Sequence, residues 1–116
     1  MSNLTIGIVD YGMGNHASVM HSLKSIGFKV RISDNPEILD GTDILILPGV
    51  GAFPSAMQAL RDRGLVSYLQ KQADLQRPMI GICLGMQLLT TASHEFSYTL
   101  GLNLIEGEIV PLTATK

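Results

Sequence analysis

The chain has 116 residues and a mass of 12.5 kDa, the size of one domain with room for a hydrophobic core. Its 46% hydrophobic and 16% charged residues exclude an intrinsically disordered chain, and a formal net charge of −2 provides no basic patch for nucleic acid. A single cysteine, Cys83, excludes an internal disulfide and a cysteine-rich zinc site, and no apolar run is long enough to span a membrane.

The hydrophobic pattern predicts strands and helices that alternate along the chain. In chain order we expect a strand at 4–9, a helix at 15–26, a strand at 28–32, a turn at 34–36, a strand at 43–47, a loop at 48–51, helices at 55–62 and 65–73 with Gly64 between them, a strand at 79–82, a helix at 84–92 and a strand at 104–112. Asn15 is expected to cap the first helix and Gly27 to end it.

This alternation predicts an α/β fold, an open and mostly parallel sheet with helices on both faces. Ligands bind such sheets beyond the carboxyl ends of the strands, which is where each glycine-rich loop of this sequence falls. We expect one domain, residues 1–116. New strand-like sequence opens at 106–113 and no covering helix follows before Lys116, so we expect this domain to be the N-terminal portion of something larger.

The charged fraction and the N-terminal sequence indicate what the protein contacts and in which compartment we expect it. A charged fraction below the usual value of roughly 25% predicts apolar surface that meets a partner or further protein. The segment 1–6 lacks the basic and apolar regions of a signal peptide, and one cysteine fits a reducing compartment. We therefore expect a cytoplasmic protein.

The sequence Gly-Ile-Cys-Leu-Gly-Met-Gln at 81–87 predicts a nucleophile elbow built around Cys83. A strand precedes the cysteine, a helix follows it, and so sharp a turn leaves little room for side chains at Gly81 and Gly85. The helix N-terminus favours a thiolate, and the N–H of Leu84 would point to where an oxyanion forms. The alternative is an inert cysteine buried in a tight turn.

A second glycine-rich loop, Pro-Gly-Val-Gly-Ala-Phe at 48–53, follows another predicted strand. Gly49 and Gly51 allow consecutive N–H groups around Val50 to point at an anion or a developing oxyanion. Taken alone, the loop is equally typical of an ordinary turn into a helix. Taken with Cys83 at a neighbouring strand end, it is the expected second half of an oxyanion hole.

The first loop, Gly-Met-Gly-Asn-His-Ala at 12–17, indicates a competing function. It follows a strand, opens a helix and fits the dinucleotide fingerprint G-x-G-x-x-A, with Asp34 about 20 residues further on. Asp34, however, lies in a turn before Pro36, where an acidic residue is unremarkable. The other interpretation is a tight turn whose glycines let the loop pack closely.

Three histidines and one carboxylate complete the candidates. His16 and His21 are expected on the exposed side of the first helix. His94 follows the helix after Cys83, whose far end lies more than about 10 Å from the sulfur at 1.5 Å per residue, which argues against His94 as the base. Glu95 could meet a substrate ammonium if its loop folds toward the sheet edge; otherwise it is a solvated charge.

Together these motifs resemble the class I (triad) glutamine amidotransferases. The resemblance rests on residues 81–87 and 48–53, and residues 10–15 and 101–107 narrow it to the glutaminase subunits of imidazole glycerol phosphate synthase. It covers essentially the whole chain and implies the flavodoxin-like, three-layer α/β fold of that family.

The resemblance implies a role for each residue of the site. Cys83 would attack the side-chain amide of glutamine to form a γ-glutamyl thioester, which water cleaves to glutamate. The N–H of Leu84 and an N–H within the loop Gly49, Val50 and Gly51 would hold the oxyanion. By position, Gln87 and Glu95 match the residues that bind the glutamine in this family.

The resemblance also implies a partner. In the family the ammonia passes to a (β/α)8-barrel cyclase subunit of histidine biosynthesis, which uses it with a ribonucleotide intermediate. The edge loops, with Met13, Asn15, His16 and Val50, would face that subunit and account for the low charge. No cofactor, metal, nucleic acid or membrane is implied. Some close relatives supply ammonia for the amination of surface sugars instead.

In one respect the sequence departs from the family. The family's base and its orienting acid come from a later His-x-Glu segment, and no histidine of this chain matches it. General acid–base help is worth about 10²- to 10⁴-fold, so we expect the 116 residues alone to have negligible glutaminase activity. Other interpretations stay open: a related cysteine-elbow hydrolase or stress protein, a nucleotide-binding module using Gly12 and Gly14, and a non-catalytic docking domain.

Overall fold

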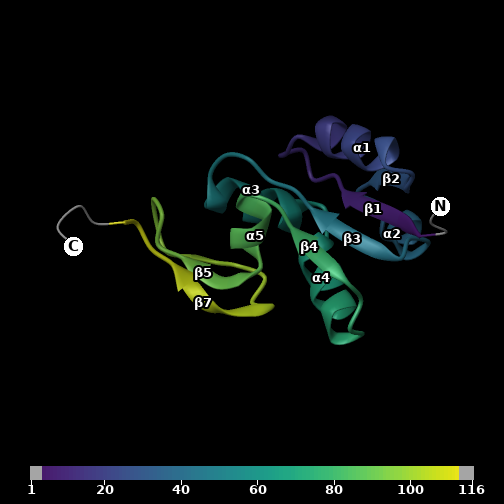
Figure 1. Ribbon diagram of the computed structural model, residues 1–116. Coiled ribbons are helices and arrows are strands. Elements are labelled where there is room, and N and C mark those ends of the chain that lie inside the picture. Colours follow the sequence, from purple (N-terminus) through teal and green to yellow (C-terminus); the bar gives the residue numbers. More distant parts are fainter. Residues whose placement is uncertain (1–3, 113–116) are drawn as a thin grey trace.

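A parallel sheet lies between helices in the computed structural model, which describes residues 4–112 (Figure 1). Its four strands lie in the order β2-β1-β3-β4, and every neighbouring pair is parallel. The strands are β1 (Thr5–Val9), β2 (Lys29–Ser33), β3 (Ile44–Leu47) and β4 (Met79–Gly81). This arrangement confirms the predicted α/β class and the mostly parallel sheet.

Helices cover both faces of this sheet. They are α1 (His16–Ser25), α2 (Pro36–Asp40), α3 (Phe53–Asp62), α4 (Leu65–Asp74) and α5 (Leu84–Leu88). Because side chains alternate along a strand, β1 and β3 contribute to two separate clusters. Ile6, Ile8 and Ile46 pack against α1 on one face, and the larger cluster joins the other face to α3, α4 and α5.

The chain after α5 differs from the prediction of a helix to residue 92. It leaves the helix at once and forms a second sheet, in which β5 (Thr90–Ser93) pairs with β6 (Thr99–Leu100) and with β7 (Ile105–Ile109). The carbonyls of residues 88–91 accept N–H groups from residues 101–105, so the acceptors that would continue the helix are occupied by a distant segment. The predicted last strand is β7, and it joins this second sheet rather than the main one.

Turns and caps agree with the sequence at most positions. Gly27 (φ 101°) follows α1, and Gly64 (φ 68°) separates α3 from α4. Asn15 occupies the N-cap position of α1, as expected, although its side chain makes no capping hydrogen bond. Expectations about residues 1–3 and 113–116 lie outside the described residues. Within residues 4–112 no helix is long and apolar enough to cross a membrane.

Arg77 joins several elements at the edge where β3 and β4 begin, opposite the glycine-rich loops. Its guanidinium donates to the carbonyl oxygens of Leu39 and Thr42 and to the Thr42 hydroxyl. It also donates to Tyr68 Oη at 3.1 Å and to Gln72 Oε1 at 3.0 Å. Since only 12% of the Arg77 side chain is exposed, these acceptors depend on it rather than on water.

We therefore expect Arg77→Met to lower the free energy of unfolding by on the order of 3 kcal/mol, because it keeps the apolar stem and leaves the acceptors unpaired. Urea denaturation measures the loss. Arg61→Met, at an exposed position near the end of α3, is the matched control and should change the free energy by less than about 0.5 kcal/mol. Equal losses in the two variants would contradict the role given to Arg77.

Candidate active site

Cys83 occupies the sharp turn between β4 and α5 and is exposed. Its backbone has φ 56° and ψ −125°, a conformation that costs a non-glycine residue free energy and must be imposed by its surroundings. Three backbone hydrogen bonds impose it: the N–H of Ile82 donates to Leu47 O at 3.0 Å, that of Gly85 to Ile82 O at 2.9 Å, and that of Met86 to Cys83 O at 2.9 Å. The structure therefore shows the predicted elbow, with an accessible sulfur.

The glycines on either side of Cys83 are required by space. A Cβ built on Gly85 would lie 1.8 Å from the carbonyl oxygen of Leu47, and one on Gly81 would lie 2.7 Å from Met86 Cα. Both obstacles are backbone atoms, which cannot give way as a flexible side chain would. The elbow is thus pressed directly against the end of β3, the strand that leads into the second glycine-rich loop.

That loop contacts the elbow, as the sequence predicts. The position of a Cβ on Gly49 is 2.8 Å from Gly85 N and 3.0 Å from Leu84 Cβ. The N–H of Leu84, which we expected to point at an oxyanion, donates instead to the carbonyl of Gly49 at 3.2 Å. In this conformation the N–H that we expected to bind an oxyanion is therefore already engaged, and Val50 in the same loop is exposed.

Gln87 and Glu95 have polar groups free for a ligand. Gln87 lies in α5, four residues after Cys83 in the sequence. Glu95 lies in the turn after β5, where its N–H donates to Ser93 Oγ at 3.1 Å. Both side chains are half-buried, and neither makes a hydrogen bond or ion pair with another residue of the described range. The structure shows no direct bond between either side chain and Cys83.

The histidines do not supply a base to the sulfur. His94 Nε2 lies 2.6 Å from Glu108 Oε1, and its ring is 5.0 Å from that of Tyr98. His21 is exposed as expected, whereas His16 is half-buried, contrary to expectation, and its Nε2 lies 3.1 Å from Asp10 Oδ1. Among residues 4–112 no histidine lies within hydrogen-bonding distance of the Cys83 sulfur.

The first glycine-rich loop packs against the second one. A Cβ on Gly14 would lie 3.3 Å from the Pro48 ring. This favours the interpretation that the glycines of the first loop allow it to pack closely, rather than bind a dinucleotide. The acidic residue of the dinucleotide fingerprint, Asp34, is paired with Arg63 Nε at 3.6 Å. Ala17, at the position where the fingerprint needs a small packed residue, is exposed.

The residues expected to face a partner lie in these two loops and at the start of α1. Asn15 and Val50 are exposed, whereas Met13 and His16 are half-buried. Met13 reaches across to the second loop, where its Cε lies 3.1 Å from the position of a Cβ on Gly51. A molecule bound at this edge would therefore meet both loops together.

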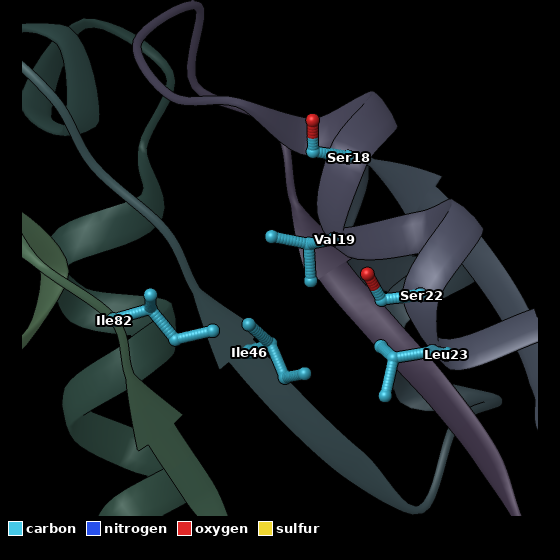
Figure 2. A pocket seen from close by; sticks show the side chains of 6 residues that line it. All are labelled: Ser18, Val19, Ser22, Leu23, Ile46 and Ile82. Atoms are coloured by element: carbon cyan, nitrogen blue, oxygen red, sulfur yellow. The ribbon is translucent and has the colours of Figure 1, made fainter. Parts of the chain in front are cut away.

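A separate groove of about 340 Å³ lies between α1 and the side of the sheet formed by β3 and the residue after β4 (Figure 2). Its lining is almost wholly apolar and consists of Ser18, Val19, Ser22, Leu23, Ile46 and Ile82. None of the predicted site residues lines it, so it is not where the cysteine chemistry would occur. The described residues also contain no cluster of His, Cys, Asp and Glu that could hold a metal ion.

Comparison with known proteins gives consistent matches. Residues 7–110 match the family described as "Glutamine amidotransferase class-I". The imidazole glycerol phosphate synthase subunit HisH of Symbiobacterium thermophilum is 50% identical over 107 residues, 92% of this chain and 50% of that protein. The HisH subunit of Sulfurimonas denitrificans is 47% identical over 111 residues, 96% of this chain and 54% of that protein.

The chain thus spans about half the length of the curated relatives it matches. A crystal structure of a glutamine amidotransferase has the same fold, with a TM-score of 0.77 at 21% sequence identity. That match covers 90% of this chain and 55% of the other. At this identity the likeness supports the fold alone.

We expect Gly85→Ala to lower the free energy of unfolding by more than about 4 kcal/mol, because its methyl group overlaps the Leu47 carbonyl oxygen. Urea denaturation measures the loss, and any folded fraction should show altered reactivity of Cys83 with an aromatic disulfide. Gly41→Ala is the control, since its nearest neighbour would be at 3.5 Å, and should change the free energy by less than about 1 kcal/mol. Wild-type stability and reactivity in Gly85→Ala would refute the steric requirement.

Proposed function

The chain belongs to the class-I glutamine amidotransferase family, and we propose that it carries the nucleophile of a glutaminase subunit of imidazole glycerol phosphate synthase. The proposal rests above all on one observation: an exposed cysteine in a strained strand–helix turn, in contact with a loop able to complete an oxyanion hole. The names of both relatives favour the histidine pathway over the amination of surface sugars.

The proposed reaction converts glutamine and water to glutamate and ammonia. The Cys83 thiolate forms a bond to the side-chain amide carbon, and the carbonyl oxygen becomes an oxyanion. The carbon–nitrogen bond then breaks, the nitrogen takes up a proton, and ammonia leaves a γ-glutamyl thioester. Water attacks the thioester, the carbon–sulfur bond breaks, and glutamate departs with the thiol restored.

The occupied donor at Leu84 sets a condition for this reaction. Its N–H donates to Gly49 O, which belongs to the peptide between Gly49 and Val50. If that peptide rotates, the N–H of Leu84 is released and the N–H of Val50 turns toward the same point, giving two donors for the oxyanion. Gly49 suits this rotation because it has no Cβ to hinder the change in its ψ angle.

Substrate binding is proposed to use the two free side chains. The carboxylate of Glu95 offers an ionic partner for the α-ammonium group of glutamine, and the amide of Gln87, in the helix that follows Cys83, offers hydrogen bonds. Neither side chain bonds to another residue of the described range, and the polar atoms of both are open to solvent, so both are available to a ligand. The turn carrying Glu95 would have to lie against the elbow when glutamine is bound.

The proposed partner is a (β/α)8-barrel cyclase subunit, which would receive the ammonia. Its docking surface would be the edge formed by Met13, Asn15, His16 and Val50, where the two glycine-rich loops meet. The glutamine site opens at the same edge, so a subunit seated there would cover it and could keep the ammonia from water.

Labelling of Cys83 tests the proposal directly. A chloroketone analogue of glutamine should modify this one cysteine stoichiometrically, whereas a chloroketone with a plain alkyl chain should react far more slowly, as measured by intact-mass spectrometry and peptide mapping. Equal rates with the two reagents would show that the site has no preference for glutamine.

A matched variant isolates the substrate contact. Glu95→Gln keeps the side-chain shape but removes the charge, so it should reduce the preference for the glutamine analogue by about 10-fold, the effect of losing a charged hydrogen bond of about 1.5 kcal/mol. Its rate with the alkyl reagent should stay at the wild-type value. Glu106→Gln, which changes an exposed carboxylate within β7, serves as the control.

Unlike the labelling of Cys83, the catalytic hydrolysis of glutamine needs a general base. Because no histidine of the described range contacts the sulfur, we expect the 116-residue chain alone to release ammonia from glutamine at a negligible rate, since general acid–base help of about 10²- to 10⁴-fold is missing. A coupled glutamate dehydrogenase assay measures the ammonia. Steady release that disappears in Cys83→Ser would show that the chain contains its own base.

A further inference from the structure

Tyr11 is a fully buried residue beside the second glycine-rich loop, and the reaction proposed above gives it no role. Its hydroxyl donates to the carbonyl oxygen of Pro48 at 2.5 Å, and its ring belongs to the larger core cluster. Burial raises the pKa of this phenol well above its ordinary value, so the hydroxyl keeps its proton at neutral pH.

The hydroxyl of Tyr11 also lies directly behind Gly49. A Cβ on Gly49 would lie 2.6 Å from Tyr11 Oη. The preceding carbonyl, of Leu47, is held by the N–H of Ile82 at 3.0 Å. The chain is therefore fixed by hydrogen bonds at two successive carbonyls, Leu47 and Pro48, immediately before the peptide whose carbonyl occupies the oxyanion donor.

We infer that Tyr11 is a positioning residue that fixes the Pro48–Gly49 peptide, so that only the Gly49–Val50 peptide turns when the oxyanion hole forms. This inference rests on the proposed function. A fixed Gly49 Cα confines the rotation to two torsions, and the N–H of Val50 then arrives at one defined point. Without the hydroxyl, the whole loop could shift, and the N–H of Val50 would no longer have one fixed position relative to the oxyanion.

A merely structural role for Tyr11 makes a different prediction. The hydroxyl would then only satisfy a buried carbonyl, and its loss would lower the free energy of unfolding without affecting the chemistry of the folded molecule. The two roles are separated by reagents that differ in their need for an oxyanion hole. Attack on a chloroketone carbonyl passes through an oxyanion before chloride leaves, whereas iodoacetamide loses iodide in a direct displacement that forms none.

The experiment compares the wild-type chain with Tyr11→Phe, which keeps the buried ring. We expect the labelling rate of Cys83 by the glutamine-like chloroketone to fall about 10-fold, less than the roughly 100-fold effect of deleting a whole oxyanion donor. The rate with iodoacetamide should stay within about 2-fold. Tyr68→Phe, which loses a hydroxyl bonded to Asp40 at 2.8 Å at the opposite edge, is the control and should change neither rate.

Equal falls in both rates, or no change in either, would overturn the inference. If Tyr11→Phe unfolds in plain buffer, both chains are measured in trimethylamine N-oxide, which favours the compact state, and the same criteria apply. A wild-type chain that shows no preference for the glutamine-like reagent would refute the proposed function itself. A wild-type preference that survives unchanged in Tyr11→Phe would refute only the role of Tyr11.

Discussion

The geometry of the site depends on the close approach of two strand ends. The turn at Cys83 exists because the backbone after β4 meets the backbone at the end of β3, with the Leu47 carbonyl filling the space where Gly85 would carry a side chain. A parallel sheet supplies this approach at no extra cost, since neighbouring strands end at the same edge. That packing sustains the strained φ of Cys83 and leaves the residue exposed.

The main sheet and most of the helices could be predicted from the sequence because their signals are local. The strand at Ile44–Leu47 is apolar on both faces, and Gly27 and Gly64 stand where helices must end. The second sheet could not be predicted, because residues 88–91 carry a helical apolar spacing yet give their carbonyls to residues 101–105. These partners are ten or more residues apart in the sequence, and a local hydrophobic pattern carries no information about such distant pairs.

For the site, spacing alone was enough for the elbow and its adjoining loop, because both are defined by glycines at fixed offsets. The direction of one N–H was not predictable: the donor at Leu84 is engaged by Gly49, and peptide orientation leaves no trace in the sequence. Tyr11 was also missed as a functional candidate. The signal in the sequence was that Tyr11 lies two residues after the buried Val9 and so on the same side of an extended chain. A tyrosine buried there needs an acceptor for its hydroxyl.

An exposed cysteine at the carboxyl edge of the sheet is also open to oxidation. Peroxide oxidises an accessible cysteine to a sulfenic acid, which is normally rescued by condensation with a second thiol. These 116 residues contain no other cysteine, so the rescuing thiol must come from outside them. A small thiol such as glutathione would have to reach the sulfur from the same side as the proposed glutamine. Anything that covers that side would then shield the sulfur from oxidant and from repair alike.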